Sequence, residues 1–188
     1  MVHAVLPALI PDIRKVYDIY FAAFKGERMS QLMLQVLVPE GQIDSDEFRA
    51  AHAAGTLSYW HTCDTQYTFT CFDMETGDIS GMGLGDLFIR PRSDEERKNH
   101  GVPWLTGEKR ERAEKVLNPL WEMRERLFGG QPYIHIHVIG VDPKHQRKGA
   151  GVAMAQRLVH KAEVLGTDED IVVPLMVRMP LVAKGMSF

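Results

Sequence analysis

The sequence has few cysteines, no long apolar run and no large excess of charge of either sign. Its two cysteines, Cys63 and Cys71, are too few and wrongly spaced for a zinc framework or a disulfide scaffold. We expect both to be buried free thiols. No apolar run is long enough to cross a membrane. The apolar N-terminus lacks a basic leader and contains Pro7 and Pro11, so it predicts a first strand and not a signal peptide.

The charge balance narrows the possible partners. A formal net charge of −3 at pH 7 argues against bulk binding to nucleic acid, which favours a clearly basic surface. The chain has 188 residues, which is enough for one domain with a substantial core. We therefore expect a single cytoplasmic domain over residues 1–188, with no nucleic-acid partner and no membrane association.

The most informative segment lies between Tyr133 and Gly151 and reads YIHIHVIGVDPKHQRKGAG. It begins as an apolar strand, passes through an Asp-Pro turn, and continues as a basic loop with glycines at 149 and 151 that runs into a helical pattern. At a helix N-terminus, unpaired N–H groups and the helix dipole both favour an anion. Glycines let a ligand approach the backbone closely. This arrangement predicts an anion-binding loop.

Two well-known phosphate-binding loops fit this segment poorly. A dinucleotide-binding loop requires a third glycine three residues after the second, and Met154 stands at that position. A Walker loop requires Gly-Lys-Ser or Gly-Lys-Thr, which the sequence does not contain.

The loop instead resembles the acyl-CoA-binding motif of the GNAT superfamily of N-acyltransferases. The similarity lies in Gln-x-x-Gly-x-Gly after a strand that ends in Val-Asp-Pro. The resemblance implies acetyl-CoA as co-substrate, with its pyrophosphate on the loop amides and its pantetheine arm along the strand. The implied pyrophosphate residues are Gln146, Arg147, Lys148, Gly149, Ala150, Gly151 and Val152. The implied pantetheine residues are Ile139, Gly140 and Val141.

Two further features of the segment are read through the same resemblance. The GNAT strand carries a bulge that opens a slot for the thioester, and Gly140 suits a bulge, although it could also pack under a bulky neighbour. The basic side chains of Lys144, His145, Arg147 and Lys148 could contact CoA phosphates. The alternative is a plain solvated turn.

His135 and His137 lie two residues apart on one strand, so their side chains face the same way. The spacing resembles that of arylalkylamine N-acetyltransferases, in which a His-x-His pair relays the proton of the substrate amine. The resemblance implies catalytic roles for both residues. The alternatives are two histidines packed on a half-buried strand face, or a metal pair. No third metal ligand is evident in the sequence, so we expect no metal.

The order of elements predicts an α/β fold, with a mixed, mostly antiparallel sheet, flanking helices and one central parallel crossover. Residues 91–130 would be an enlarged insertion between the third and fourth strands. Expected strands cover residues 2–6, 65–72, 79–90, 134–141 and 171–177. Expected helices cover residues 12–25, 44–54, 107–128 and 152–165, and residues 31–38 fit either a helix or a strand.

The C-terminal region departs from the family pattern. GNAT enzymes usually continue past the fifth strand with a helix and two more strands, and a tyrosine there often protonates the leaving thiolate. Here no tyrosine follows Tyr133, and only residues 178–188 follow the expected fifth strand. We therefore expect curtailed C-terminal strands and an open sheet edge, through which a homo-oligomer could form.

The sequence leads to one primary functional hypothesis and two alternatives. The primary one is an acyl-CoA-dependent N-acyltransferase that moves acetyl from acetyl-CoA to a small primary amine by direct attack. The first alternative is a non-catalytic CoA-binding or protein-interaction module of GNAT fold. The second is modification of a protein N-terminus or lysine, because nothing in the sequence specifies the acceptor.

Overall fold

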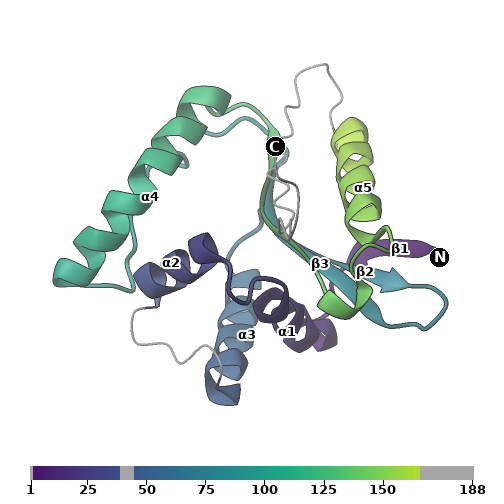
Figure 1. Cartoon of the computed structure of the whole chain (residues 1–188). Helices are drawn as coiled ribbons and strands as arrows, with labels where there is room; N and C mark the ends of the chain where they lie inside the picture. The colour runs from purple at the N-terminus through teal and green to yellow at the C-terminus, as the bar shows by residue number, and fades with distance from the viewer. Residues whose placement is uncertain (1, 39–44, 166–188) are drawn as a thin grey trace, which may run out of the picture.

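The protein is represented by a computed structural model that describes residues 2–38 and 45–165. Three helices follow the first strand, a hairpin of two strands comes next, and one helix stands before and one after the last described strand (Figure 1). The strands are β1 (His3–Pro7), β2 (Gln66–Asp73), β3 (Ile79–Phe88) and β4 (Tyr133–Val141). The helices are α1 (Ile13–Ala23), α2 (Arg28–Leu37), α3 (Asp46–Trp60), α4 (Gly107–Phe128) and α5 (Ala150–Leu165). Two short 3₁₀ turns, η1 (Ile10–Asp12) and η2 (Pro143–His145), precede α1 and α5.

The described strands form one antiparallel four-stranded sheet in the order β1-β2-β3-β4. Helix α5 covers one face of this sheet and α1 covers the other, while α2 and α3 pack beside α1 and α4 lies to the outside (Figure 1). This mixed α/β arrangement, with an antiparallel sheet and flanking helices, confirms the predicted fold class. The fifth strand at 171–177, the parallel crossover that it would complete and the expected open edge all lie outside the described residues.

Two apolar layers hold the sheet between α1 and α5. On the α5 side, Phe69 and Ile136 pack against Met154 and Leu158, and all four are at most 1% exposed. On the α1 side, Val16 and Ile19 pack against Met82, also at most 1% exposed. Burial of such side chains contributes about 1.5–3 kcal/mol each. The two layers fix β4 in place, and β4 leads directly into the loop that we predicted to bind an anion.

Strand β4 carries a bulge at His137. Leu84 pairs with Val138 and Gly85 pairs with Ile136, so His137 has no partner on β3. A bulge shifts the alternation of side chains by one residue. As a result Ile136 and Ile139 both pack on the α5 side, whereas Val138 packs on the α1 side.

The bulge is therefore not at Gly140, where we predicted it. Gly140 pairs regularly with Met82. A Cβ at position 140 would lie 3.2 Å from Sδ of Met82 and 3.4 Å from Cβ of Ala23. The glycine lets α1 approach the sheet closely, which was the alternative reading of this residue.

The helices follow the expected order but differ at their ends and on their buried faces. Helix α3 begins after Ser45, whose Oγ accepts a hydrogen bond from the N–H of Phe48 at 3.1 Å, and continues through Gly55 to Trp60. We predicted a start at Asp44, which lies outside the described residues, and an end at Gly55. A single glycine costs a helix only about 1 kcal/mol, and the packing of Ala53 and Leu57 offsets that cost.

Helices α4 and α5 bury narrower faces than the apolar pattern indicates. On α5 the buried residues recur every four positions, at Ala150, Met154, Leu158 and Ala162, while Val152 and Val159 are 61% and 45% exposed. On α4, Leu120 and Leu127 are 56% and 63% exposed. Helix α4 contacts α2 and the segment that precedes α4, but it does not lie flat on the sheet, so its apolar side chains are only partly covered.

We expect Gly83→Ala to destabilise the protein by about 1–3 kcal/mol, because it overfills a packed core. A Cβ at position 83 would lie 2.0 Å from Cζ of Phe69, whose ring is fully buried. Gly55→Ala is the matched control, because no atom lies within 4 Å of its added Cβ. That variant should gain up to about 1 kcal/mol in α3. Urea unfolding of both variants measures the difference, and equal midpoints would contradict the packing of Phe69 on β3.

Candidate functional site

The loop from β4 to α5 presents unpaired backbone N–H groups at a helix N-terminus. Arg147 and Gly149 adopt positive φ angles of 62° and 94°. Helix α5 begins at Ala150. The N–H of Ala153 donates a hydrogen bond to the carbonyl oxygen of Gly149, the residue just before the helix, at 3.0 Å. Among the residues that the structure describes, the N–H groups from position 147 to 152 have no hydrogen-bond acceptor. Such a loop can bind an anion through its backbone alone.

Side chains from three parts of the chain hold the loop in shape. Nε2 of His3, on β1, lies 2.8 Å from the carbonyl oxygen of Lys148. Gln146 donates from Nε2 to the carbonyl oxygen of Val141 at 3.3 Å. Asp142 accepts from the N–H of Lys144 at 3.0 Å and lies 3.4 Å from Nζ of Lys15 on α1. The loop is thus held to both β1 and α1.

The predicted phosphate residues occupy different environments. Arg147, Lys148 and Gly149 are exposed, and Ala150 is buried under the sheet. Gly151 is half-buried, and a Cβ there would contact Val141 at 3.8 Å. The side chain of Gln146 is hydrogen-bonded to the carbonyl oxygen of Val141 within the segment itself. Val152 is exposed, so its backbone and not its side chain is the feature that a ligand could use.

The predicted pantetheine residues present their backbone at the edge of the described sheet. The side chains of Ile139 and Val141 pack toward α5, and Gly140 has none to offer. Within residues 2–38 and 45–165, β4 pairs with β3 only, so its other edge carries free N–H and C=O groups. That edge leads straight into the loop.

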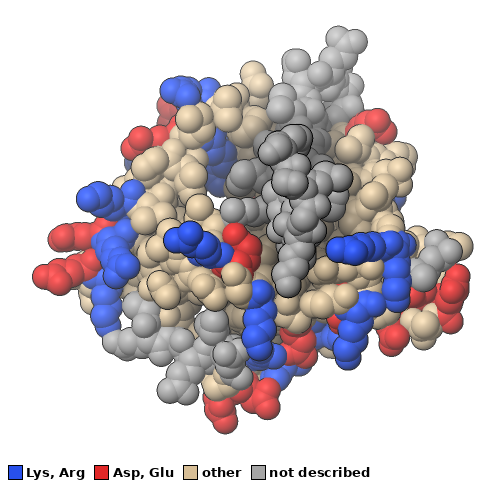
Figure 2. Space-filling model, in the orientation of Figure 1, with Lys and Arg blue, Asp and Glu red and all other residues tan. Residues whose placement is uncertain are grey.

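The basic cluster is smaller than predicted. Lys144 is exposed like Arg147 and Lys148, and basic side chains surround the N-terminal end of α5 in Figure 2, with acidic ones nearby. His145 does not project with them. It is half-buried, and its Nδ1 lies 3.8 Å from Oδ2 of the buried Asp73. Three basic side chains therefore remain available to an anionic ligand.

His135 and His137 lie side by side, as their spacing predicts. Their ring centroids are 4.5 Å apart, with the planes at 74°. Asp86 on β3 completes the group, because its Oδ2 lies 2.7 Å from Nε2 of His137. Thr65 donates from Oγ1 to the other oxygen of Asp86 at 3.3 Å and so orients the carboxylate. Asp86 pairs with His135 across the sheet, which the sequence alone could not indicate because the register depends on the bulge.

The pKa values of His135 and Asp86 are both lowered in this group. Burial, together with the positive charges of His137 and Arg124, lowers the pKa of His135 to about 4, against the opposing effect of Asp86. Burial acts to raise the pKa of Asp86, but the hydrogen bond from His137 and the electrostatic interactions with both histidines and Arg124 outweigh burial, so the pKa lies below its usual value. At neutral pH Asp86 is therefore a carboxylate and His135 a neutral imidazole.

The ionised Asp86 fixes the tautomer of His137. A carboxylate only accepts hydrogen bonds, so Nε2 of His137 must carry the proton that it donates across the 2.7 Å contact. When the ring is neutral, Nδ1 of His137 therefore holds a free lone pair. The ring is 44% exposed, so this basic nitrogen is open to a ligand. Asp86 thus orients His137 so that one ring nitrogen can accept a proton, whereas the pKa of His135 is lowered.

We expect His135 to make the protein less stable in acid. In the unfolded chain this histidine titrates near pH 6.5, and in the folded protein near pH 4. Between these values the unfolded state binds the extra proton, so stability falls as pH decreases through that window. With a discount for partial exposure, the loss attributable to His135 is about 2 kcal/mol. Urea unfolding at pH 7 and pH 4, in a chelating buffer, should show a smaller loss for His135→Gln. His160→Gln, on the exposed face of α5, is the control, and an equal loss in both variants would contradict the effect.

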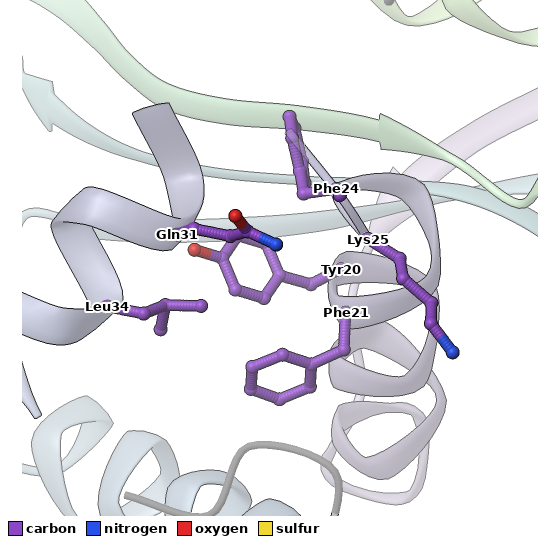
Figure 3. A pocket seen from close by; sticks show the side chains of 7 residues that line it. Tyr20, Phe21, Phe24, Lys25, Gln31 and Leu34 are labelled. Carbon is purple, nitrogen blue, oxygen red and sulfur yellow. The ribbon is translucent and has the colours of Figure 1, made fainter. Parts of the chain in front are cut away.

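A small pocket lies between α1 and α2, beside β4. Its cavity of about 120 Å³ is lined by aromatic and aliphatic side chains together with Lys25 and Gln31. In Figure 3 the amide of Gln31 lies beside the ring of Tyr20, and Lys25 extends away from the cavity. Phe24 joins the pocket to the sheet, since a Cβ on Gly140 would contact its ring at 3.6 Å.

Two tryptophans, Trp60 and Trp104, lie outside this pocket. Trp60 packs in the apolar cluster between α1 and α3. Trp104 is 65% exposed and donates from Nε1 to the carbonyl of Leu37 at 3.2 Å. Both cysteines are free, Cys71 buried and Cys63 half-buried.

Comparison with known sequences decides the family. The sequence model of the acetyltransferase (GNAT) family matches residues 40–173, which is more than half of the chain. The chain belongs to the GNAT acetyltransferase family. The match spans both the histidine strand and the glycine loop. No curated protein sequence is significantly similar to the chain.

One of the similar solved structures supports the GNAT fold. A protein of Corynebacterium glutamicum, described as histone acetyltransferase HPA2 and related acetyltransferase, shares 18% identity at a TM-score of 0.54, over 92% of this chain and 76% of that one. Two others are less similar. AAC(6')-Iy in complex with the bisubstrate analogue CoA-S-monomethyl-acetylneamine has 10% identity and a TM-score of 0.43, over 97% of this chain and 83% of that one. Glucosamine-6-phosphate N-acetyltransferase of Arabidopsis thaliana has 14% identity and a TM-score of 0.42, over 94% and 84%.

Membership of the GNAT family implies acetyl-CoA as the acyl donor and a separate acceptor. It does not extend to the finer resemblance to arylalkylamine N-acetyltransferases, which stays a prediction. None of the described helices is long and apolar enough to cross a membrane. The cytoplasmic location, the single domain over 1–188 with its insertion at 91–130, and the homo-oligomer also stay predictions.

Proposed function

We propose that this GNAT protein transfers acetyl from acetyl-CoA to a small primary amine. One observation supports the proposal above the others. Strand β4 carries a proton acceptor, His137 oriented by Asp86, in its middle, and ends in a loop of unpaired N–H groups at the start of α5. A site for an anionic donor and a base for an amine therefore belong to one continuous segment.

The loop suits the pyrophosphate of CoA. Its backbone N–H groups from Arg147 to Val152 have no acceptor within the described chain, and they lie at the positive end of the α5 dipole. Lys144, Arg147 and Lys148 add charge beside them. The exposed edge of β4 from Ile139 to Val141 can pair with the amides of a pantetheine arm, as a strand would. Acetyl-CoA supplies the activated acyl group when bound there.

His137 is the group we assign to proton transfer. An attacking amine forms a C–N bond with the acyl carbon, the C–S bond breaks, and the nitrogen must lose a proton. Nδ1 of His137 can accept it, directly or through a water, while Asp86 stabilises the imidazolium that results. His135 stays neutral and adjoins His137 as a second, weaker proton carrier.

The pocket between α1 and α2 suits the body of a small acceptor. It is lined in part by aromatic rings, holds about 120 Å³, and adjoins β4 through Phe24 and Gly140. A cavity of this size fits a few non-hydrogen atoms of an apolar group. Amines with a compact apolar or aromatic substituent are therefore the first class to test.

The proposal is tested in two steps. Calorimetric titration of the full chain with acetyl-CoA should show saturable binding. A panel of small amines is then assayed for release of free CoA thiol, which should depend on the amine and saturate with it. No binding of acetyl-CoA would contradict the donor site. Binding without amine-dependent release by any amine, peptide N-terminus or lysine would instead favour a non-catalytic CoA-binding module.

A further inference from the structure

Asp86, His135 and His137 form a compact set of metal-ligand side chains. One potential ligand atom from each lies within 4.8 Å of the others. Ligand atoms that share one Zn²⁺ each lie about 2.0–2.2 Å from it, so they stand about 3–4 Å apart. Shifts of less than about 1 Å in side-chain position would bring the three atoms to that spacing. No comparable group of His, Cys, Asp and Glu occurs elsewhere in the described part of the chain.

The surroundings favour a ligand role for each of the three. Nδ1 of His135 is buried and has no hydrogen-bond partner among the described residues. A buried nitrogen without a partner costs free energy unless a ligand satisfies it. Thr65 holds the Asp86 carboxylate from behind, as outer partners orient the ligands of metal sites. The β4 bulge leaves His137 outside the strand pairing, with its ring 44% exposed, so an ion can enter from solvent.

We propose that Asp86, His135 and His137 bind a divalent transition-metal ion of the Zn²⁺ class. Two imidazoles and one carboxylate suit Zn²⁺, Co²⁺ and Ni²⁺ better than Mg²⁺ or Ca²⁺, which prefer sites made of oxygen. Three protein ligands leave the fourth position of a tetrahedral ion for water. The sequence offered the two histidines but no third ligand. Asp86 is that third ligand, brought to the pair by the register of β3 and β4.

Metal binding and proton transfer at this site exclude each other. To bind a metal through Nε2, His137 must move the proton of that nitrogen to Nδ1, and its hydrogen bond to Asp86 must break. The lone pair on Nδ1 is then lost. The same ion also draws the Asp86 carboxylate away from the ring. The ion therefore acts as an inhibitor of acetyl transfer, a consequence that rests on the proposed function, whereas binding itself does not.

The test measures metal binding directly, without acetyl-CoA. The full chain, freed of affinity tag and metal, is titrated with Zn²⁺ by calorimetry and with Co²⁺ by visible absorption. We expect one equivalent to bind, and a Co²⁺ band of a four- or five-coordinate ion without thiolate charge transfer. His135→Ala, His137→Ala and Asp86→Asn should each weaken the affinity at least about tenfold. His160→Ala, which removes an exposed histidine that lies 3.6 Å from Glu163 on α5, is the matched control and should bind as the wild type does.

Several outcomes would overturn the site. They are no saturable Zn²⁺ binding by the wild-type chain, unchanged affinity in the His135 and His137 variants, and a Co²⁺ spectrum with a thiolate band. The Co²⁺ spectrum of the wild-type chain needs no variant and so stands even where a substitution impairs folding. Because the titration omits acetyl-CoA and amine, failure of acetyl transfer leaves its result intact. If Zn²⁺ abolishes acetyl transfer by the wild-type chain but not by Asp86→Asn, the metal site and the inhibition are linked.

Discussion

Gly149→Val should weaken acetyl-CoA binding at least about 100-fold, with little effect on the rest of the fold. Gly149 has a φ of 94°, which a β-branched residue adopts only at a cost of about 1–3 kcal/mol. The side chain would also project beside His3, whose ring lies 3.8 Å from an added Cβ. The loop would change its shape and lose the alignment of its N–H groups on the pyrophosphate. Calorimetric titration with acetyl-CoA measures the loss.

Gly77→Val is the matched control for Gly149→Val. Gly77 has a similar φ of 77°, lies in the turn between β2 and β3, and has no atom within 4 Å of an added Cβ. Both variants carry the same kind of backbone strain, so both should lose some stability. Only Gly149→Val should lose acetyl-CoA affinity. Wild-type affinity in that variant would contradict the assignment of the donor site to this loop.

His137→Ala should lower kcat about 100-fold while the affinity for acetyl-CoA stays within about twofold of the wild type. His137 is the residue that Asp86 orients, and its ring is open to solvent. His135→Gln should lose less, because a histidine with a pKa of about 4 is a weak base at neutral pH. The double variant, with alanine at 135 and 137, should retain acetyl-CoA binding and lose nearly all turnover. Steady-state rates of thiol release and calorimetry separate the two effects.

The role of Asp86 in orienting His137 can be tested separately. Asp86→Asn keeps the size of the side chain but removes the charge that fixes the His137 tautomer. We expect a smaller loss of kcat than in His137→Ala and a shift of the pH–rate profile, which a merely structural role would not produce. His160→Ala on the exposed face of α5 is the control for loss of a histidine. Full activity of the double histidine variant would contradict the proton-transfer role.

The sequence predicted the order of strands and helices better than it predicted which face of each helix is buried. The order of strands and helices, the start of α5 at the glycine loop, and the pairing of His135 with His137 all follow from local pattern. Helix boundaries moved where tertiary packing outweighed a local signal, as at Gly55 in α3. The buried stripe of α5 runs through Met154 and leaves Val152 exposed, because the sheet selects which part of an apolar face it covers.

The sequence indicated the two histidines of the site but not Asp86. His135 and His137 are close in the chain, so their shared face is a property of one strand. Asp86 lies 51 residues from His137 and joins it only through the register of two strands, which a bulge has shifted by one position. We placed that bulge at Gly140 because glycine often marks one. Its actual position depends on which residues pack on α5 and which on α1, and this information is not local.

The displaced bulge divides β4 into two halves with independent tasks. Residues before His137 align the histidines with β3, and residues after it carry the edge that leads to the loop. Substitutions within either half that keep the apolar pattern should be tolerated separately. The number of residues at the bulge, in contrast, cannot change without effect. Deleting one residue there would restore regular alternation and turn the Ile139 side chain from the α5 layer to the opposite face. At the apolar positions of β4, chain length is therefore constrained more tightly than residue identity.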